Sequence, residues 1–478
     1  MSRVPNRPAR RAVRAAAASP AVAGFRPAGA ALAVAAAFAV HSGSLQAQSV
    51  PTGAIHGSAT FLRNGNNLLV TTVNGARTNH SAINWQNFSV PSGSTTYFQQ
   101  PSAASTSINR VLGPDPSAIF GTLGSNGKLV LVNPAGIAVG KGALVDTAGF
   151  TASTLGMSDA DAIAGRLAFA GDGAGVLQVD GHVIARGGDV VLIGSKVQAG
   201  SEAVVQADGA VVLAAGRKAE ITGRGLEGIR LEVQAGNEAV NLGTLQGDAV
   251  GMFANTLTHS GLVRAQAVSM EGGRVVLKAT GGDAFVSGTV DAAAAGGKGG
   301  SIDVLGERVG LFAGATLKAS GPSGGGQVRV GGDYQGQNAD VPNARRVYVD
   351  PTARIEADAT QQGDGGRVIV WSDEVTRMHG QISARGGTLG GNGGFAEVSG
   401  KQYLEYTGIA DLRAPQGGMG TLLLDPQDVT IISGTASSTS GTFPIAFGPG
   451  AAFEPTNSTG SVTLADGHLN AQLGSSHV

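Results

Sequence analysis

The sequence contains no cysteine among its 478 residues, and several other residue types are scarce. Aromatic residues make up 5% of the chain and charged residues 14%, and the formal net charge is -1. Without cysteine there can be no disulfide bonds, so the folded chain must depend on hydrogen-bond ladders and packing. The chain becomes mildly acidic once its arginine-rich N-terminus is removed, which argues against a nucleic-acid partner, whose phosphates require a basic face. The scarcity of aromatic residues disfavours a β-propeller, whose blades carry an aromatic signature.

Long hydrophobic runs are also missing, because no apolar run approaches the ~18 residues that a membrane-spanning helix needs. We therefore expect no stable membrane insertion. The N-terminus has the order of a secretory signal peptide: a charged region, an apolar run at residues 30–40 and small residues before Ala47. We predict that residues 1–47 are a signal peptide with an extended charged region. Their removal takes away six arginines and no acid, which changes the formal net charge from -1 to -7.

Glycine, in contrast, is abundant, with 77 of 478 residues, more than twice the usual share of about 7%. A repeated phrase contains many of these glycines: a double glycine followed by a short, mostly apolar segment. Six copies lie between residues 187 and 400: GGDVVLIG, GGRVVLKA, GGSIDVLG, GGQVRVGG, GGRVIVWS and GGFAEVSG. The last four copies begin 26, 40 and 28 residues apart, and the wide interval holds DYQGQNADVPNARR, which we interpret as an insertion. Periods of 20 to 50 residues are typical of repeat architectures.

These repeats predict an all-β fold built from stacked coils. A strand of about five residues cannot bury its own face, whereas stacked copies share one continuous core and leave open edges only at the two ends. Glycine at the corners lets neighbouring coils approach closely. A parallel β-helix meets these requirements. One short helix is expected at residues 158–168, where Ser158 can cap the first turn and Asp159 and Asp161 lie at its positive end.

A sharp turn separates two apolar segments in LVLVNPAGIAVG, residues 129–140. Asn133, Pro134 and Gly136 occupy the first, second and fourth positions of a type I turn, because proline presets φ and the asparagine side chain accepts from the backbone ahead. The run 129–132 shows no polar alternation, which predicts a strand buried on both faces. If Asn133 only shapes this turn, aspartate should replace it at little cost.

Further segments carry a family resemblance. INWQNFSV (83–90), INRVLGPDPSAIFGTLGSNGKLVLVNPAGIAVG (108–140) and FTASTLGMSDADAIAGRLAF (150–169) resemble the secretion domain of the filamentous haemagglutinin family, the exoproteins of bacterial two-partner secretion. The resemblance continues in order at 331–337, 347–359, 363–387, 393–408 and 420–431. It implies a right-handed parallel β-helix with small extra-helical β elements near the N-terminus.

The resemblance also implies a route and a partner. Such exoproteins leave a Gram-negative bacterium through the periplasm and a cognate outer-membrane barrel transporter, and are secreted or remain at the cell surface, where they act in adhesion. The family's transporter-recognition motif maps to Asn133, Pro134, Gly136 and Ile137. Ala135 departs from the motif, which usually has asparagine there. Asn109, at the start of the phrase NRV, is a further position implied for recognition.

The chain divides into four parts on this interpretation. They are the signal peptide (1–47), the two-partner secretion domain (48–260), continuing glycine-rich repeats (261–432) and a frayed or truncated C-terminal segment (433–478). In the secretion domain, Trp85 and Phe88 lie three residues apart in a strand-like segment, so we predict that they face opposite sides and that at least one is in the core.

Two other functions stay open. A β-helical carbohydrate-active enzyme would need clustered acids, and the nearest pair, Asp425 and Asp428, more naturally forms a turn between the strands TLLL and VTII. A contact-dependent toxin would carry its activity in a further C-terminal domain. The eight histidines are scattered, so no metal site is expected. We therefore expect no enzymatic activity and no cofactor; the glycan or protein ligand on the host is not specified by the sequence.

Overall fold

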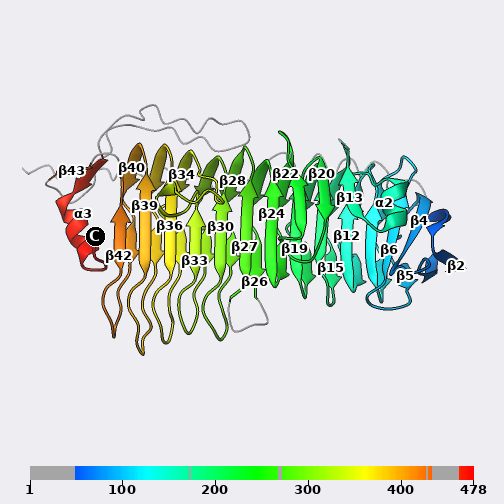
Figure 1. Cartoon of the computed structure of the whole chain (residues 1–478), viewed down its shortest axis with the longest axis horizontal. Coiled ribbons are helices and arrows are strands. Elements are labelled where there is room, and N and C mark those ends of the chain that lie inside the picture. The colour runs from blue at the N-terminus through cyan, green and yellow to red at the C-terminus, as the bar shows by residue number, and fades with distance from the viewer. Residues whose placement is uncertain (1–48, 172–173, 267–271, 427–428, 433–461) are drawn as a thin grey trace, which may run out of the picture.

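The chain coils into an elongated parallel β-helix, which Figure 1 shows from blue at its N-terminal end to red at its C-terminal end. This computed structural model describes residues 49–171, 174–266, 272–426, 429–432 and 462–478. The expected signal peptide, Asp428 and residues 433–461 lie outside the described residues. Within the described ranges, every helix is too short or too polar to cross a membrane.

Three long sheets form the sides of the β-helix, and in each sheet most neighbouring strands come from successive coils. Sheet A consists of β1 (Val50–His56), β4 (His80–Asn87), β6 (Thr106–Val111), β9 (Lys128–Val132), β12 (Gly149–Ser153), β16 (Val190–Gly194), β19 (Ala210–Ala215), β24 (Ala249–Ala254), β27 (Arg274–Ala279), β30 (Ser301–Leu305), β33 (Gln327–Val330), β36 (Arg367–Ser372), β39 (Phe395–Gly400) and β42 (Thr421–Leu424).

Sheet B consists of β2 (Ser58–Asn64), β3 (Asn67–Val73), β5 (Thr95–Gln99), β8 (Thr122–Ser125), β11 (Leu144–Thr147), β15 (His182–Ala185), β18 (Val204–Ala207), β23 (Thr244–Gly247), β26 (Leu262–Ala265), β29 (Thr289–Asp291), β32 (Thr316–Lys318), β35 (Arg354–Glu356), β38 (Gln381–Ser383) and β41 (Ile409–Asp411). Sheet C consists of β7 (Ser117–Ile119), β10 (Ile137–Val139), β14 (Val176–Val179), β17 (Lys196–Ala199), β22 (Glu238–Asn241), β25 (Thr256–His259), β28 (Asp283–Val286), β31 (Arg308–Leu311), β34 (Arg346–Val349), β37 (Val375–Met378) and β40 (Tyr403–Tyr406).

The register of sheet A confirms the repeat spacing. Ile302 pairs with Val328, Val328 with Val368, and Val368 with Ala396. These steps are 26, 40 and 28 residues, the intervals of the double-glycine phrases. The 40-residue coil holds the expected insertion, residues 333–346, which includes the 3-10 turn η1 (Tyr334–Gly336) and ends at the first residue of β34.

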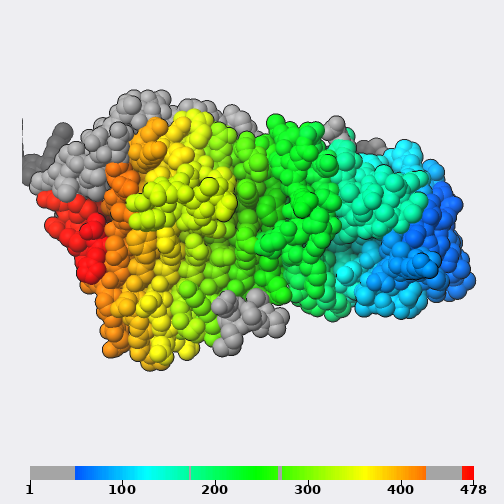
Figure 2. Space-filling model, viewed as in Figure 1, coloured from blue at the N-terminus to red at the C-terminus, as the bar shows by residue number. Residues whose placement is uncertain are grey.

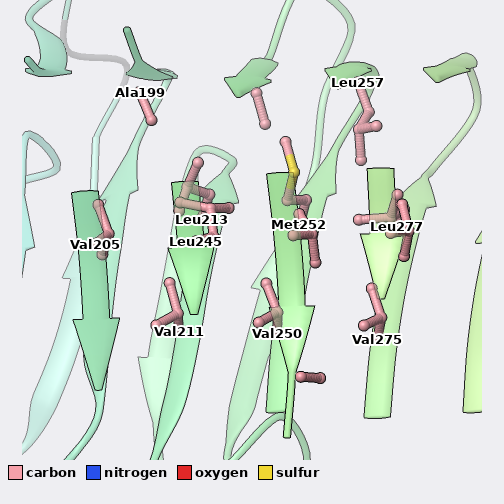
Figure 3. Close-up of a cluster of buried hydrophobic side chains, with 14 of the residues drawn as sticks. Ala199, Val205, Val211, Leu213, Leu245, Val250, Met252, Leu257, Val275 and Leu277 are labelled. Carbon is pink, nitrogen blue, oxygen red and sulfur yellow. The ribbon is translucent and has the colours of Figure 1, made fainter. Parts of the chain in front are cut away.

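Stacked side chains of similar size fill the interior. Val211, Val250 and Val275 occupy the same position on three successive strands of sheet A, and all three are 0% exposed (Figure 3). Inward residues of sheets B and C, such as Val205 and Leu257, pack against them. Because each coil repeats this pattern, the core is continuous along the described rod.

A second apolar cluster covers the outer face of sheet A in the early coils. Helix α2 (Asp159–Ala164) and the antiparallel strands β13 (Leu167–Ala170), β20 (Lys218–Ile221) and β21 (Ile229–Glu232) pack there. At the N-terminal end, β1 pairs antiparallel with β4 and β2 with β3. These additions are the expected extra-helical β elements and the expected helix, whose cap Ser158 accepts from the Asp161 amide. The helix is shorter than the expected 158–168, because Gly165 ends it in a left-handed conformation and residues 167–168 belong to β13.

The C-terminal end differs from the expectation of one helix followed by a frayed segment. A second helix, α3 (Asp466–Leu473), follows β44 (Val462–Ala465), which pairs with β43 (Val429–Ile432). Leu469 of α3 packs partly buried against the main core. The sequence does not indicate this helix, because DGHLNAQL has only two leucines at helical spacing and a buried glutamine, Gln472, also anchors it.

Candidate recognition motif in the early coils

The corner between β9 and β10 has the predicted turn. The Gly136 amide donates to the Asn133 carbonyl over 3.1 Å, and the Ala135 amide donates to the Asn133 Oδ1 over 3.0 Å. β9 before it is buried on both faces except at its first residue, Lys128, as the unbroken apolar run predicts. The turn residues therefore form one corner of an early coil.

The Asn133 side chain has further partners that its sequence position does not reveal. Its Nδ2 donates to the Asp115 carbonyl over 3.0 Å and to the Ser117 Oγ over 2.9 Å. Asn133 is 0% exposed. One side chain thus ties the corner to the preceding coil, and its amide cannot be reached from outside the folded protein.

The remaining motif residues divide into buried and accessible ones. Ile137 is 0% exposed and belongs to the main core. Gly136 has a φ of 132°, which side-chain-bearing residues rarely adopt. Pro134 is exposed and Ala135 is partly exposed. In the folded corner, the motif therefore presents only Pro134 and Ala135 to solvent.

Asn109 lies one coil before this corner and is also buried. It pairs in register with Leu131, two residues before Asn133, so the fold brings both implied recognition positions into neighbouring coils. Its Oδ1 accepts from the Trp85 Nε1 over 3.0 Å, and its Nδ2 donates to the Ser107 carbonyl over 3.0 Å. The tryptophan segment and the NRV phrase are thus joined by a buried hydrogen bond.

The predicted opposite orientation of Trp85 and Phe88 is wrong. Both are in the core, 0% and 2% exposed, with ring centroids 5.0 Å apart in an edge-to-face arrangement. β4 ends at Asn87, so the two-residue alternation of a strand no longer holds at Phe88. Phe61 and Phe98 also pack against the indole, which closes the N-terminal end of the core.

Arg110 is a further residue of this region that the sequence did not single out. Its side chain is buried, and its Nη1 donates to the Asn84 Oδ1 over 3.2 Å and to the Asp159 carboxylate. Asp159 was expected only to favour the positive end of α2. The ion pair fixes that end of α2 on sheet A. The sequence does not indicate this pair, because Arg110 and Asp159 are 49 positions apart.

A metal site requires several His, Asp or Glu side chains in a suitable arrangement. Across the residues that the structure describes, no group of three or more His, Asp or Glu side chains has the arrangement of a metal site. Asp425 is exposed, and its expected turn partner Asp428 lies outside the described residues.

The comparisons with known proteins agree with this geometry. The family model described as TPS secretion domain matches residues 47–304, more than half of the chain. The crystal structure of the HMW1 secretion domain from Haemophilus influenzae is similar, with a TM-score of 0.70 and 31% sequence identity, and the match covers 79% of this chain and 100% of that domain.

Two curated relatives are heme/hemopexin-binding proteins of Haemophilus influenzae. One is 34% identical over 113 residues, which is 22% of this chain and 12% of the relative. The other is 38% identical over 72 residues, which is 15% of this chain and 8% of the relative. The matched segments span about a tenth of these relatives' length. On the family match and the shared fold, this chain belongs to the TPS secretion domain family and is an exoprotein of two-partner secretion, secreted across the outer membrane to the cell surface or the medium.

Proposed function

We propose that the early coils engage a cognate outer-membrane barrel transporter before they fold, and that the exported rod acts in adhesion without enzymatic activity. The observation that carries the first part is the burial of the motif amides. Asn133 is 0% exposed and Asn109 is 2% exposed. A transporter that reads these amides must therefore meet them in the unfolded chain, because the closed coil uses them internally.

The topology suits folding in the order of export. The first pairings, β2 with β3 and β1 with β4, join segments close in sequence, and later coils each add to the coil before them. Each added coil removes apolar area from water at roughly 25 cal/mol per Å². Coils that form outside the membrane thus make return of the chain progressively less favourable.

Secretion with and without the transporter tests this proposal. The full chain is expressed with its cognate barrel protein, and the exported fraction is measured in the medium and on the cell surface. We expect export to require the barrel protein and to fall when Asn109 or Asn133 is changed to alanine. Asn64, exposed on the β2–β3 hairpin, provides a matched control as Asn64→Ala. Undiminished export without the barrel protein would refute the proposed partner.

The non-enzymatic part is supported by how one buried carboxylate, Glu397, is used. Burial raises the pKa of Glu397 above its usual value, as in a general acid. However, Glu397 is 0% exposed, both its oxygens accept from the Gln335 amide over 3.2 Å, and its Oε1 also accepts from the Ser399 Oγ over 3.0 Å. The carboxylate holds the insertion at residues 333–346 on sheet A and has no open side toward a substrate. Glycan hydrolysis by the wild type that Glu397→Gln abolished would contradict this role.

The adhesive part is supported by the shape of the molecule. The strands of sheets B and C stack along the rod (Figure 1), so their outward-facing side chains can contact an extended ligand at many points. Binding of the purified mature chain to host cells and to immobilised glycans tests this part. Heme and hemopexin, the ligands in the relatives' name, form a separate arm measured by absorbance titration and by pull-down. Binding confined to that arm would replace adhesion as the proposed role.

A further inference from the structure

The insertion at residues 333–346 lies on the outer face of sheet A and presents an aromatic ring there. Figure 2 shows the insertion in yellow-green over the yellow coils that follow it in the chain. Tyr334, in the turn η1, is 39% exposed. Its ring centroid lies 5.9 Å from that of Phe395, on β39, in an edge-to-face arrangement. The insertion therefore places a partly solvent-facing ring over a later coil of the rod.

Arg367, on β36, stacks its guanidinium on both of these rings. The Cζ atom of Arg367 lies 5.0 Å from the centroid of the Tyr334 ring and 5.4 Å from that of the Phe395 ring. The electron-rich face of an aromatic ring attracts a guanidinium, which remains charged and planar in such a stack. We name these three residues the Tyr334 cluster. It combines an exposed cation with an exposed aromatic ring.

The charge of Arg367 is not neutralised by a partner as that of its neighbour in the preceding coil is. Arg329 pairs with Asp303 over 2.6 Å. Among the residues that the structure describes, no hydrogen bond or ion pair involves Arg367. The residues paired with it in the sheet register, Gln327 and Phe395, are uncharged. The donors of this exposed guanidinium are therefore available to an anion from outside.

Polar contacts hold the turn that carries the ring. The Asp333 Oδ1 accepts from the Tyr334 amide over 2.7 Å, and the Gln335 amide donates to the buried Glu397 over 3.2 Å. Gln335 has a φ of 53°, which side-chain-bearing residues rarely adopt and which these contacts maintain. A ring held in this way loses little conformational freedom when a ligand binds.

We propose that the Tyr334 cluster binds an acidic sugar, a pyranose ring that carries a carboxylate; this inference rests on the adhesive role proposed above. The guanidinium of Arg367 offers a planar fork of donors that matches a carboxylate in bidentate geometry. The ring of Tyr334 offers an apolar surface to the C–H groups of the sugar and a hydroxyl for a hydrogen bond. An acidic peptide side chain would use the arginine alone, whereas an acidic pyranose joins both features in one rigid unit.

Saturation-transfer NMR with the purified full-length mature protein tests the site. A hyaluronan tetrasaccharide carries its carboxylates on uronic acids, and sialyllactose carries its carboxylate on a sialic acid. Lactose is the neutral control. We expect an acidic probe to bind more tightly than lactose, and the probe that binds identifies which acidic sugar the cluster recognises.

Variants of the cluster assign the binding to its residues. Arg367→Gln should weaken binding of the acidic probe about tenfold, and Arg367→Lys should recover part of the loss, because it restores the charge but not the planar fork. Tyr334→Ala should weaken binding about three- to tenfold. Arg354→Gln is the matched control: it alters an exposed arginine on β35 with the same change in net charge, and it should bind like the wild type.

Equal affinity of Arg367→Gln and the wild type, or equal binding of lactose and the acidic probes, would overturn the proposed site. An equal loss in Arg354→Gln would also overturn it, because the effect would then come from net charge. Adhesion to host cells is measured in parallel. Adhesion that Arg367→Gln leaves unchanged would refute this site alone, whereas a wild type that binds an acidic probe and does not adhere would refute the adhesive role alone.

Discussion

Replacement of Asn133 by aspartate separates the architectural role of the corner from its recognition role. Aspartate keeps the Oδ1 that accepts from the Ala135 amide. It loses the Nδ2 that donates to the Asp115 carbonyl and to the Ser117 hydroxyl. The new oxygen would face the Asp115 carbonyl at the 3.0 Å now spanned by a hydrogen bond. The expectation from turn preferences alone, that aspartate is tolerated, does not fit these contacts.

The magnitude follows from the contacts and the burial. The lost hydrogen bond to the Asp115 carbonyl costs about 1 kcal/mol, whereas the Ser117 hydroxyl can turn and donate to the new oxygen. An ionised carboxylate that has only the Ala135 amide and this hydroxyl as neutral donors, at a position with 0% exposure, raises the total to about 3–5 kcal/mol. The loss should shrink in acid, because a protonated carboxyl regains one donor. Pro134→Ala, at an exposed position, should cost about 1 kcal/mol or less through the greater freedom of the unfolded chain.

Urea unfolding of the purified mature chain, with hydrogen exchange at the Ala135 and Gly136 amides, measures the local loss, since a stacked fold need not unfold in one step. Asn64→Asp, at an exposed turn position, is the control and should change stability by about 0.5 kcal/mol or less. Equal stability of Asn133→Asp and this control would refute the structural argument. If Asn133→Asp were as stable as the control but were not exported, the transporter would be recognising the Asn133 amide itself.

Three further changes have predictable outcomes. His259 is fully buried, and burial lowers its pKa from 6.5 to about 4. The free energy of unfolding should therefore be highest above pH 6.5 and fall by about 3 kcal/mol as the pH drops toward 4. His259→Gln should flatten this part of a pH–stability curve, and an unchanged slope would contradict the assignment. Trp85→Phe removes the donor to Asn109 and should cost about 1–3 kcal/mol in urea unfolding, whereas a neutral result would show that the bond contributes nothing. Gly136→Ala, at a φ of 132°, should lower the melting temperature through about 1–3 kcal/mol of backbone strain, and no shift would mean that the corner relaxes.

The periodic parts of the fold were predictable because each coil repeats the same local requirements. The double-glycine phrases mark the strands of sheet A, and their spacing equals the register of Ile302, Val328, Val368 and Ala396. The turn at Asn133 was predictable for the same reason, since its chemistry lies within four residues.

The contacts that close the molecule were not predictable in this way. Arg110 meets Asp159 across 49 residues, and Gln335 meets Glu397 across 62. Such pairs leave no period in the sequence, because they depend on how many residues each insertion adds between coils. The burial of both motif asparagines likewise becomes visible only when the neighbouring coil is in place.

The unequal coil lengths have a mechanical consequence. Tension applied at the C-terminal end would peel coils away one at a time, since each coil is bonded mainly to its two neighbours. The coil from Ile302 to Val328 contains 26 residues and would release roughly 85–95 Å of extended chain, whereas the coil from Val328 to Val368 contains 40 and would release roughly 130–145 Å. In a single-molecule stretching experiment, the extension released at each step should therefore match the number of residues in the coil that unfolds, and coils with insertions should give the longest steps.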